Sequence, residues 1–430
     1  MKNLFTGALL FLLSADAAAQ APVRPRVDQL ISAIEPKVIA WRRDFHQNPE
    51  LSNREFRTAE KVAAHLKALG LEVRTGIAHT GVVGILRGAN PGPVIGLRAD
   101  MDALPVVERV DIPFKSTAKS TYNGEEVGVM HACGHDTHVA IMMGVAEVLS
   151  QMRAELAGTV VFIFQPAEEG PPTGEEGGAD LMIKQGVLDN PKIEAMFGLH
   201  INAHTPAGHI RYRSGGTMAS SDWFFIKVHG KQTHGAAPWH GVDPIVVSSQ
   251  IIAGLQTIVS RQSNLTEQPV VITVGKFDAG VRANIVPETA ELVGTIRTLD
   301  TNMRRQVHER VIRTAEKIAE SAGAHAEVRI ENKTPITFND PKLTNWALKS
   351  LQAAAGADNV KEMKPMTGAE DFGFFGKKVP SFFFFLGGMP KDKKPDEAAA
   401  HHTPDFYIDE SGFSLGVRSF CYLVLDYFKS

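Results

Sequence analysis

Four short segments of this chain carry side chains that commonly bind metal ions. Residues 130–138, 165–170, 198–200 and 401–404 together supply a cysteine, several histidines and a pair of adjacent glutamates. Thiolate, imidazole and carboxylate groups are the usual ligands of zinc and its neighbours. Taken singly, each segment has a simpler explanation, because a lone histidine is usually an ordinary polar residue and a glutamate pair is usually solvated. Their combination favours a metal centre.

The placement of these residues relative to strand-like runs supports that interpretation. The Glu168–Glu169 pair follows one such run, His200 closes a second, and Asp100 and Asp102 follow a third. In an open α/β sheet, ligands bind outside the carboxyl ends of the strands. We therefore expect these side chains to converge on one edge of a sheet.

Around the first cysteine, candidate ligands recur at every second position. His131, Cys133 and His135 alternate with other residues, which suits an extended loop and does not suit one face of a helix. The second cysteine, Cys421, lies in an apolar run near the C-terminus and is typical of a buried helix residue. Because the two contexts differ, we do not expect a disulfide between them.

Alternating strand and helix patterns predict the framework that positions these residues. The expected helices are 27–45, 55–69, 138–156, 342–355 and one at the C-terminus, and the expected strands are 82–86, 94–97, 159–164, 193–199 and 380–386. Such alternation indicates an α/β domain whose mixed sheet is flanked by helices.

A different order of elements occupies residues 215–333. There the patterns predict a strand at 223–228, a helix at 244–260, strands at 270–277 and 289–298, a helix at 303–323 and a strand at 326–331. This order is that of the split βαβ, ferredoxin-like α+β unit. The sequence thus predicts one α/β domain, formed by residues 20–214 and 334–430, that is interrupted by an inserted domain at 215–333.

Charge and the N-terminal residues limit the partners and the location. The chain has 430 residues and a formal net charge of -3, so no basic surplus is available for nucleic acid or an anionic membrane. Residues 1–19 predict a signal peptide, because Lys2 precedes a short apolar run, and Ala17 and Ala19 fit a cleavage site. We expect an exported protein, periplasmic or secreted, without a membrane anchor after cleavage.

Beyond these patterns, the chain resembles the M20 metallopeptidase family, in the branch of hippurate hydrolases, N-acyl-amino-acid hydrolases and auxin-conjugate hydrolases. The resemblance covers the mature chain through motifs in one order, at 98–105, 130–138, 165–170, 198–200, 234–238, 283–287, 294–297, 368–372 and 402–404. The ordered set is far more specific than any single motif. It implies a hydrolase that cleaves the amide bond of N-acyl amino acids or related small amides.

The resemblance also implies a role for each matched residue of the metal centre. The general base falls at Glu168, and Asp102 matches an aspartate that orients a ligand. Adjacent residues of an extended segment point in opposite directions, so one carboxylate of the pair can bind metal while its neighbour reaches the water. The implied ligands, which hold two divalent ions of Zn, Mn, Co or Ni with a bridging thiolate, are Cys133, His135, Glu169, His200 and His402.

The inserted domain would be the family's lid and dimerisation domain, which predicts a homodimer. His234 matches a histidine that reaches a substrate oxygen, often in the partner subunit's site. Asn284 and Arg297 match residues that bind the carboxylate end of the substrate, a role that suits the planar guanidinium.

Two positions depart from the family pattern. Trp239 stands where a histidine usually follows the motif proline, with His240 after it, and this leaves the acyl preference open. His401 replaces a usual apolar residue before His402, so the choice of ligand between the two rests only on the Thr-Pro that follows.

Two other functions stay open. A dipeptidase or carboxypeptidase of the same family cleaves a similar bond, and a non-catalytic metal- or ligand-binding protein can use the same fold. Every implied ligand and the base are present in the chain, which favours the hydrolase.

Overall fold

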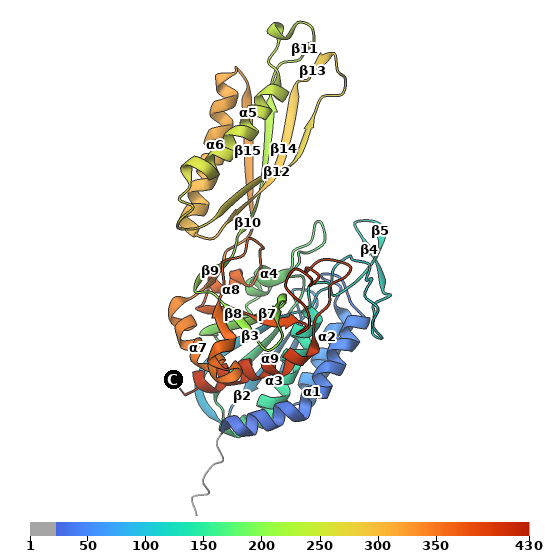
Figure 1. The fold of residues 1–430 in the computed structure, drawn as a ribbon, viewed down its shortest axis with the longest axis vertical. Coiled ribbons are helices and arrows are strands. Elements are labelled where there is room, and N and C mark those ends of the chain that lie inside the picture. The colour runs from blue at the N-terminus through green and yellow to red at the C-terminus, as the bar shows by residue number, and fades with distance from the viewer. Residues whose placement is uncertain (1–22, 430) are drawn as a thin grey trace, which may run out of the picture.

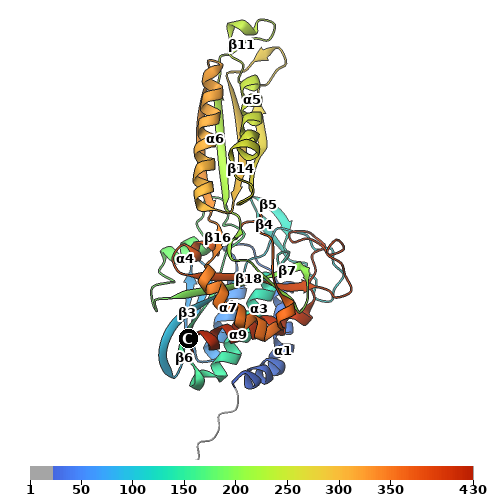
Figure 2. The same cartoon turned by 60° about the vertical axis from the view of Figure 1, so that its left-hand side comes forward.

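The computed structural model describes residues 23–429, so the predicted signal peptide lies outside the described residues. Figures 1 and 2 show a large lower part and a smaller, elongated upper part that are joined at one end of the upper part. Within residues 23–429, no helix combines the length and the apolarity needed to cross a bilayer.

The larger part is built on an eight-stranded mixed sheet in the order β1-β2-β6-β3-β7-β18-β8-β17. Its strands are β1 (Glu72–Ile77), β2 (Gly81–Arg87), β3 (Asn90–Asp100), β6 (Ala157–Gln165), β7 (Ala195–Pro206), β8 (Ile210–Tyr212), β17 (Val360–Glu362) and β18 (Ser381–Met389). β3 is parallel to β6 and β7, and β7 is parallel to β18. The carboxyl ends of these four central strands therefore share one edge, as the sequence predicted.

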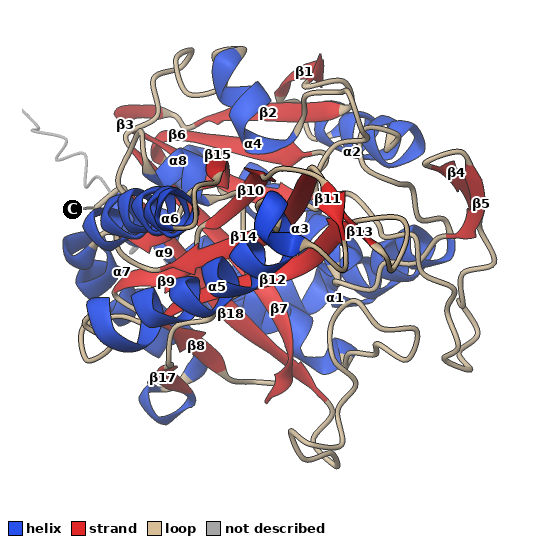
Figure 3. Ribbon diagram, turned by 90° about the horizontal axis from the view of Figure 1, so that it is seen from above, coloured by secondary structure: helices blue, strands red, loops and turns tan. Residues whose placement is uncertain are grey.

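Helices cover both faces of the sheet (Figure 3), and the middle of each central strand is therefore buried. One face packs against α1 (Val23–Gln47), α2 (Phe56–Ala68), α3 (His135–Gln151), α7 (Pro341–Ala355) and α9 (Phe413–Tyr427). The other face packs against α4 (Gly178–Lys184) and α8 (Gly373–Gly376). Alternate residues of β18 enter the two cores, with Phe382 and Phe384 on one side and Phe383 and Phe385 on the other.

Helix α3 lies in the middle of the larger part and carries the start of the site. Its residues 135–149 are all buried, which is expected of a helix that is apolar around its whole circumference. It begins at His135 rather than at the predicted 138, because Gly134 adopts a left-handed φ of 91° that turns the loop into the helix. It ends at Gln151 rather than 156, because residues 153–155 form a separate turn before β6.

The smaller part is a four-stranded sheet in the order β12-β14-β10-β15 with a hydrophobic cluster of its own. Its elements are β10 (Ser221–His229), α5 (Pro244–Thr257), β12 (Val270–Ala279), β14 (Thr289–Thr298), α6 (Thr301–Ser321) and β15 (His325–Thr334), in the order that the sequence predicted. Asp243 and Asp300 cap the two helices, since each side chain accepts a hydrogen bond from backbone N–H groups of the first turn.

Three pairs of short strands lie outside the two large sheets. β9 (Gly215–Met218) pairs with β16 (Thr337–Asn339) at the junction of the two parts, so the four-stranded sheet starts a few residues later than the predicted boundary at 215. β11 (Thr233–His234) pairs with β13 (Ile285–Val286) at the far end of the smaller part (Figure 1). β4 (Lys119–Tyr122) and β5 (Glu125–Gly128) form a hairpin beside the larger part.

Candidate metal centre and active site

The predicted metal ligands come from separate places along the carboxyl edge of the large sheet. Cys133 lies in the loop before α3, and His135 is the first residue of that helix. Glu169 follows β6, His200 lies within β7, and His402 belongs to the loop after β18. The sequence analysis placed His200 at the close of its strand. The structure corrects this position, because β7 pairs with β18 and continues past His200 to Pro206.

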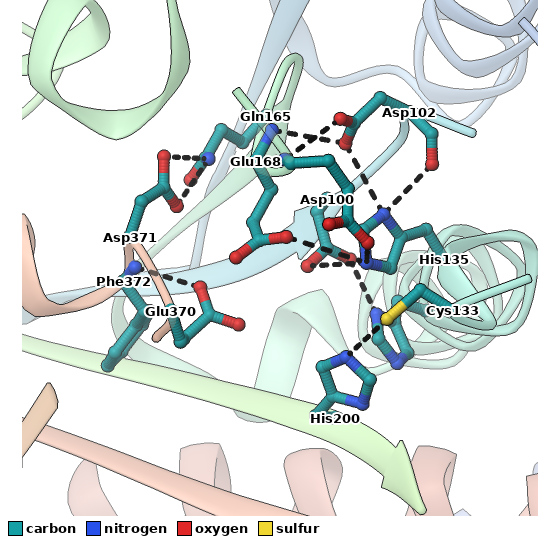
Figure 4. A network of polar contacts seen from close by, with 12 residues as sticks. Asp100, Asp102, Cys133, His135, Gln165, Glu168, His200, Glu370, Asp371 and Phe372 are labelled. Carbon is teal, nitrogen blue, oxygen red and sulfur yellow. Dashed lines mark hydrogen bonds and ion pairs between the residues drawn. The ribbon is translucent and has the colours of Figure 1, made fainter. Parts of the chain in front are cut away.

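Cys133 is the point where these side chains meet. Its Sγ lies 3.3 Å from His200 Nε2 and 3.2 Å from His402 Nε2. Glu169 Oε1 lies 3.0 Å from His402 Nε2 and 4.0 Å from His135 Nε2. The structure therefore brings all the predicted ligands into one group, part of which is seen in Figure 4.

The hydrogen bonds of two histidines fix which ring nitrogen faces the group. His135 Nδ1 lies 2.9 Å from the carbonyl oxygen of Asp102, and His200 Nδ1 lies 2.5 Å from that of Ile201. A carbonyl oxygen only accepts, so both Nδ1 atoms carry the proton and donate. Nε2 of each ring therefore faces the group, and it is the nitrogen through which a histidine held in this way binds a metal.

The donor atoms fit a divalent cation. His135 Nε2 and Glu169 Oε1 are buried, and neither finds a hydrogen-bond partner among residues 23–429; the 3.0 Å approach of His402 to that oxygen is an ion-pair distance only. Burial, and then the carboxylates of Glu169 and Glu168, raise the pKa of the Cys133 thiol well above its ordinary value. A bound cation would satisfy both buried atoms and hold the sulfur as a thiolate. Sulfur, nitrogen and carboxylate donors are typical of zinc and its neighbours.

Asp102 supports the group in two ways. Its carboxylate accepts hydrogen bonds from the backbone N–H groups of Glu168, at 3.1 Å, and Glu169, at 3.0 Å, and its carbonyl oxygen holds His135. The chain reaches this carboxylate through a left-handed turn at Ala167, with φ 53°. The Asp102 carboxylate also lies 3.3 Å from His135 Nδ1, so this residue contacts the histidine through its backbone and its side chain, and the glutamate pair through its side chain.

The Glu168 carboxylate lies between the ligand group and two further carboxylates. Its Oε2 lies 3.8 Å from His135 Nε2, and its carboxylate also faces those of Glu370 and Asp371 (Figure 4). Burial, and then repulsion by Glu370 and Glu169, raise the pKa of Glu168 well above its ordinary value. A carboxyl group in such surroundings takes up a proton readily.

One buried arginine balances the carboxylates behind Glu168. The Arg98 guanidinium lies 2.6 Å from Asp100, 2.8 Å from Glu370 and 2.8 Å from Asp371, and its side chain is fully buried. The motifs at 98–105 and 368–372 marked these residues in the sequence without giving them a role. Their partnership joins β3 to the segment before α8.

His138 is a further residue of the site that the sequence analysis did not assign. Its Nδ1 lies 2.5 Å from Asp100 Oδ1, and its Nε2 accepts a hydrogen bond from the backbone N–H of Ile201 at 2.8 Å. The ring stands 4.7 Å from that of His200. Its signal in the sequence was its place three residues after His135, which puts both side chains on one side of α3.

The adjacent histidines His401 and His402 face different partners. His402 Nε2 contacts the sulfur of Cys133 and the carboxylate of Glu169, and its backbone adopts a left-handed φ of 64°. His401 Nε2 instead accepts a hydrogen bond from the backbone N–H of Ala203 at 3.1 Å. Burial, and then the neighbouring His402, lower the pKa of His401 to about 3, so its ring is neutral.

Two of the predicted substrate-binding residues of the smaller part, His234 and Asn284, lie apart from the ligand group within one chain (Figure 1). His234 and Asn284 are exposed and lie side by side at β11 and β13, where Gly235 N donates to Asn284 O at 2.9 Å. Figure 1 places these strands at the end farthest from the large sheet. Arg297 lies near the end of β14 and is half-buried.

A cavity of about 350 Å³ opens beside Glu169. Its walls come from the Glu169–Gly170 turn, the segment after β3 and the β4–β5 hairpin, and they include Leu51, Ala103, Leu104, Pro105, Tyr122 and Pro172. Polar residues complete the walls, among them Ser52, Arg54, Thr121 and Asn123, so the cavity offers both apolar and polar contacts to a small ligand.

Comparison with known proteins places the chain in a family. A model of peptidase family M20/M25/M40 matches residues 96–426. The chain belongs to this family. Thermostable carboxypeptidase 2 of Saccharolobus solfataricus is 41% identical over 92% of this M20 chain and 97% of its own length. N-acetylcysteine deacetylase of Bacillus subtilis is 38% identical over 91% of this chain and 97% of its own.

A solved structure extends the similarity. The crystal structure of a Bacillus subtilis dinuclear metal-binding peptidase of the M20 family matches with a TM-score of 0.76 and 35% identity, over 92% of this chain and 98% of that one. The predicted family and α/β fold are therefore confirmed. This M20 protein is a metal-dependent hydrolase of amide bonds.

Proposed function

We propose that this M20 hydrolase cleaves the amide bond of N-acyl amino acids or related small amides, at a site with two divalent ions. One observation carries the proposal. A group of sulfur, imidazole and carboxylate donors is accompanied by a separate buried carboxylate, Glu168, whose Oε2 lies 3.8 Å from His135 Nε2. A purely structural metal site is usually closed and has no such spare carboxylate.

The residues of the chain divide the chemistry between them. Two ions held by Cys133, His135, Glu169, His200 and His402 would supply a water molecule of lowered pKa and polarise the substrate carbonyl. Glu168 is the general base: it accepts the proton from the attacking water and passes it to the leaving nitrogen. Its raised pKa supports this role, because the carboxyl must keep the proton between the two steps.

The substrate class rests on the cavity and on the relatives. The cavity beside Glu169 has both apolar and polar walls, which matches the mixed character of an N-acyl amino acid. One similar relative is named an N-acetylcysteine deacetylase, and another a carboxypeptidase, so a peptide substrate is the second candidate.

The distant position of His234 supports a homodimer in which this histidine serves the site of the other subunit.

A substrate screen tests the proposal. Metal-free protein is loaded separately with Zn, Mn, Co or Ni, and release of free amine is measured with N-acetyl and N-benzoyl amino acids and with dipeptides. We expect faster turnover of the N-acyl amino acids. Faster turnover of dipeptides would favour the peptidase, and bound metal without any hydrolysis would contradict an enzymatic role.

Sequencing the N-terminus of the exported protein tests the cleavage predicted after residue 19.

A further inference from the structure

His401 differs from the neighbouring histidines in the ring nitrogen that the protein engages. In His135 and His200, Nδ1 is tied to a carbonyl oxygen and Nε2 faces the ligand group. In His401 the pattern is reversed, because Nε2 lies 3.1 Å from the backbone N–H of Ala203 and Nδ1 faces Cys133. The two kinds of histidine therefore present different chemistry to the same centre.

The hydrogen bonds determine the tautomer of His401. A backbone N–H only donates, so Nε2 must accept and cannot carry a proton. The single proton of the neutral ring is therefore on Nδ1. That atom lies 3.2 Å from the carbonyl oxygen of Cys133 and 3.8 Å from its Sγ, and both of these atoms are acceptors.

Packing holds the His401 ring in this orientation. Its centroid lies 4.8 Å from that of Phe406 and 5.3 Å from that of His200. Ala203 belongs to β7, three residues after His200. His401 thus connects the loop that carries Cys133 with the strand that carries another predicted ligand, and no lone pair of its ring is left to bind a metal ion.

We propose that His401 is a positioning residue whose Nδ1–H is shared between the carbonyl oxygen and the sulfur of Cys133, and that it thereby orients the thiolate without binding the metal itself. The inference rests on the metal centre of the proposed function. Hydrogen bonds from outside the ligand shell fix the orientation and the electron density of ligands. A hydrogen bond to the sulfur lowers the energy of its lone pair, so a thiolate-to-metal charge-transfer band moves to shorter wavelength.

Two matched substitutions separate the two hydrogen bonds of His401. In His401→Asn the amide nitrogen takes about the place of Nδ1, so the donor to Cys133 is kept and the acceptor for Ala203 is lost. In His401→Gln the amide oxygen reaches about the place of Nε2, so the acceptor is kept and the donor is lost. The same two substitutions at His325, an exposed histidine of β15, serve as controls.

The readout is the near-ultraviolet absorption of the cobalt-loaded full-length protein, together with cobalt affinity from chelator competition. We expect His401→Gln to move the thiolate-to-cobalt band to longer wavelength and to weaken cobalt binding about tenfold. His401→Asn should keep the band of the unsubstituted protein. Thermal unfolding of the metal-free variants shows that each is folded.

Three results would overturn the proposal. The band can stay unchanged in His401→Gln, or both variants can shift it equally. Both variants can also bind less cobalt per chain, which would make His401 a ligand. If the unsubstituted protein itself showed no charge-transfer band with cobalt, the proposed metal centre would fail instead, and the role of His401 would fail with it.

Discussion

Replacing Asp102 with asparagine tests how the site is held in place. The Asp102 carboxylate is buried and accepts hydrogen bonds from the backbone N–H groups of Glu168 and Glu169, as well as one from Ser52 Oγ at 2.7 Å. Asparagine has the same shape but only one oxygen. Its NH₂ group must therefore face one of the donors, and that hydrogen bond is lost.

The size of the effect follows from these contacts. A hydrogen bond to a charged group contributes about 1.5–3 kcal/mol, and the lost bond holds the turn that presents the glutamate pair. Each 1.4 kcal/mol corresponds to about a tenfold change in Kd. We therefore expect Asp102→Asn to bind metal about 10–100-fold more weakly, which is the range found when supporting residues of metal sites are changed.

The assay is metal Kd by chelator competition, measured beside the free energy of unfolding of the metal-free protein. Ser52→Ala is the control, because it removes a hydrogen bond to Asp102 that does not hold the glutamates. We expect it to lower the free energy of unfolding by about 1 kcal/mol and to leave metal Kd nearly unchanged. An Asp102→Asn variant with the metal Kd of the unsubstituted protein would refute the reasoning.

Three further changes have defined outcomes. Glu168→Gln should lower kcat by about 10²–10⁴-fold with unchanged metal content, and a fully active variant would exclude Glu168 as the base. Arg98→Met leaves three buried carboxylates without their countercharge and should cost about 3–5 kcal/mol of unfolding free energy in urea titrations; an effect below about 1 kcal/mol would contradict this. Burial disfavours the charged form of His46, but its contacts with Asp136 at 2.8 Å and Glu108 at 3.1 Å outweigh this and raise its pKa. The protonated ring therefore stabilises the fold below its unfolded pKa of about 6.5, and this contribution is lost as the pH rises through the folded pKa. The stability gap between the unsubstituted protein and His46→Gln should narrow as the pH rises above about 6.5, and a constant gap would show that His46 does not titrate in this way.

The elements that present the site were predictable because their signals are local. Apolar, β-branched runs marked the central strands, and the residues that follow them were expected at one edge of the sheet. The structure places Asp100, Glu169 and His200 at that edge. The order of elements in the smaller part was also predicted, whereas its roles as lid and dimerisation domain stay predictions.

The supporting contacts were not predictable from the sequence. Arg98 meets Glu370 and Asp371 across a separation of more than 270 positions in the chain. His138 was passed over because its partners, Asp100 and Ile201, come from two different strands. Such pairs leave no periodic pattern in a sequence, since each partner is chosen by the packing of the sheet.

The sequence by itself determined which donor groups exist and which strands and loops carry them, because side-chain chemistry and hydrophobic periodicity are properties of the chain. Only the tertiary structure decided which nitrogen of each histidine faces the centre. His200 and His401 have the same side chain, but a carbonyl oxygen engages Nδ1 of one and a backbone N–H engages Nε2 of the other. That difference depends on where the folded backbone presents its donors and acceptors.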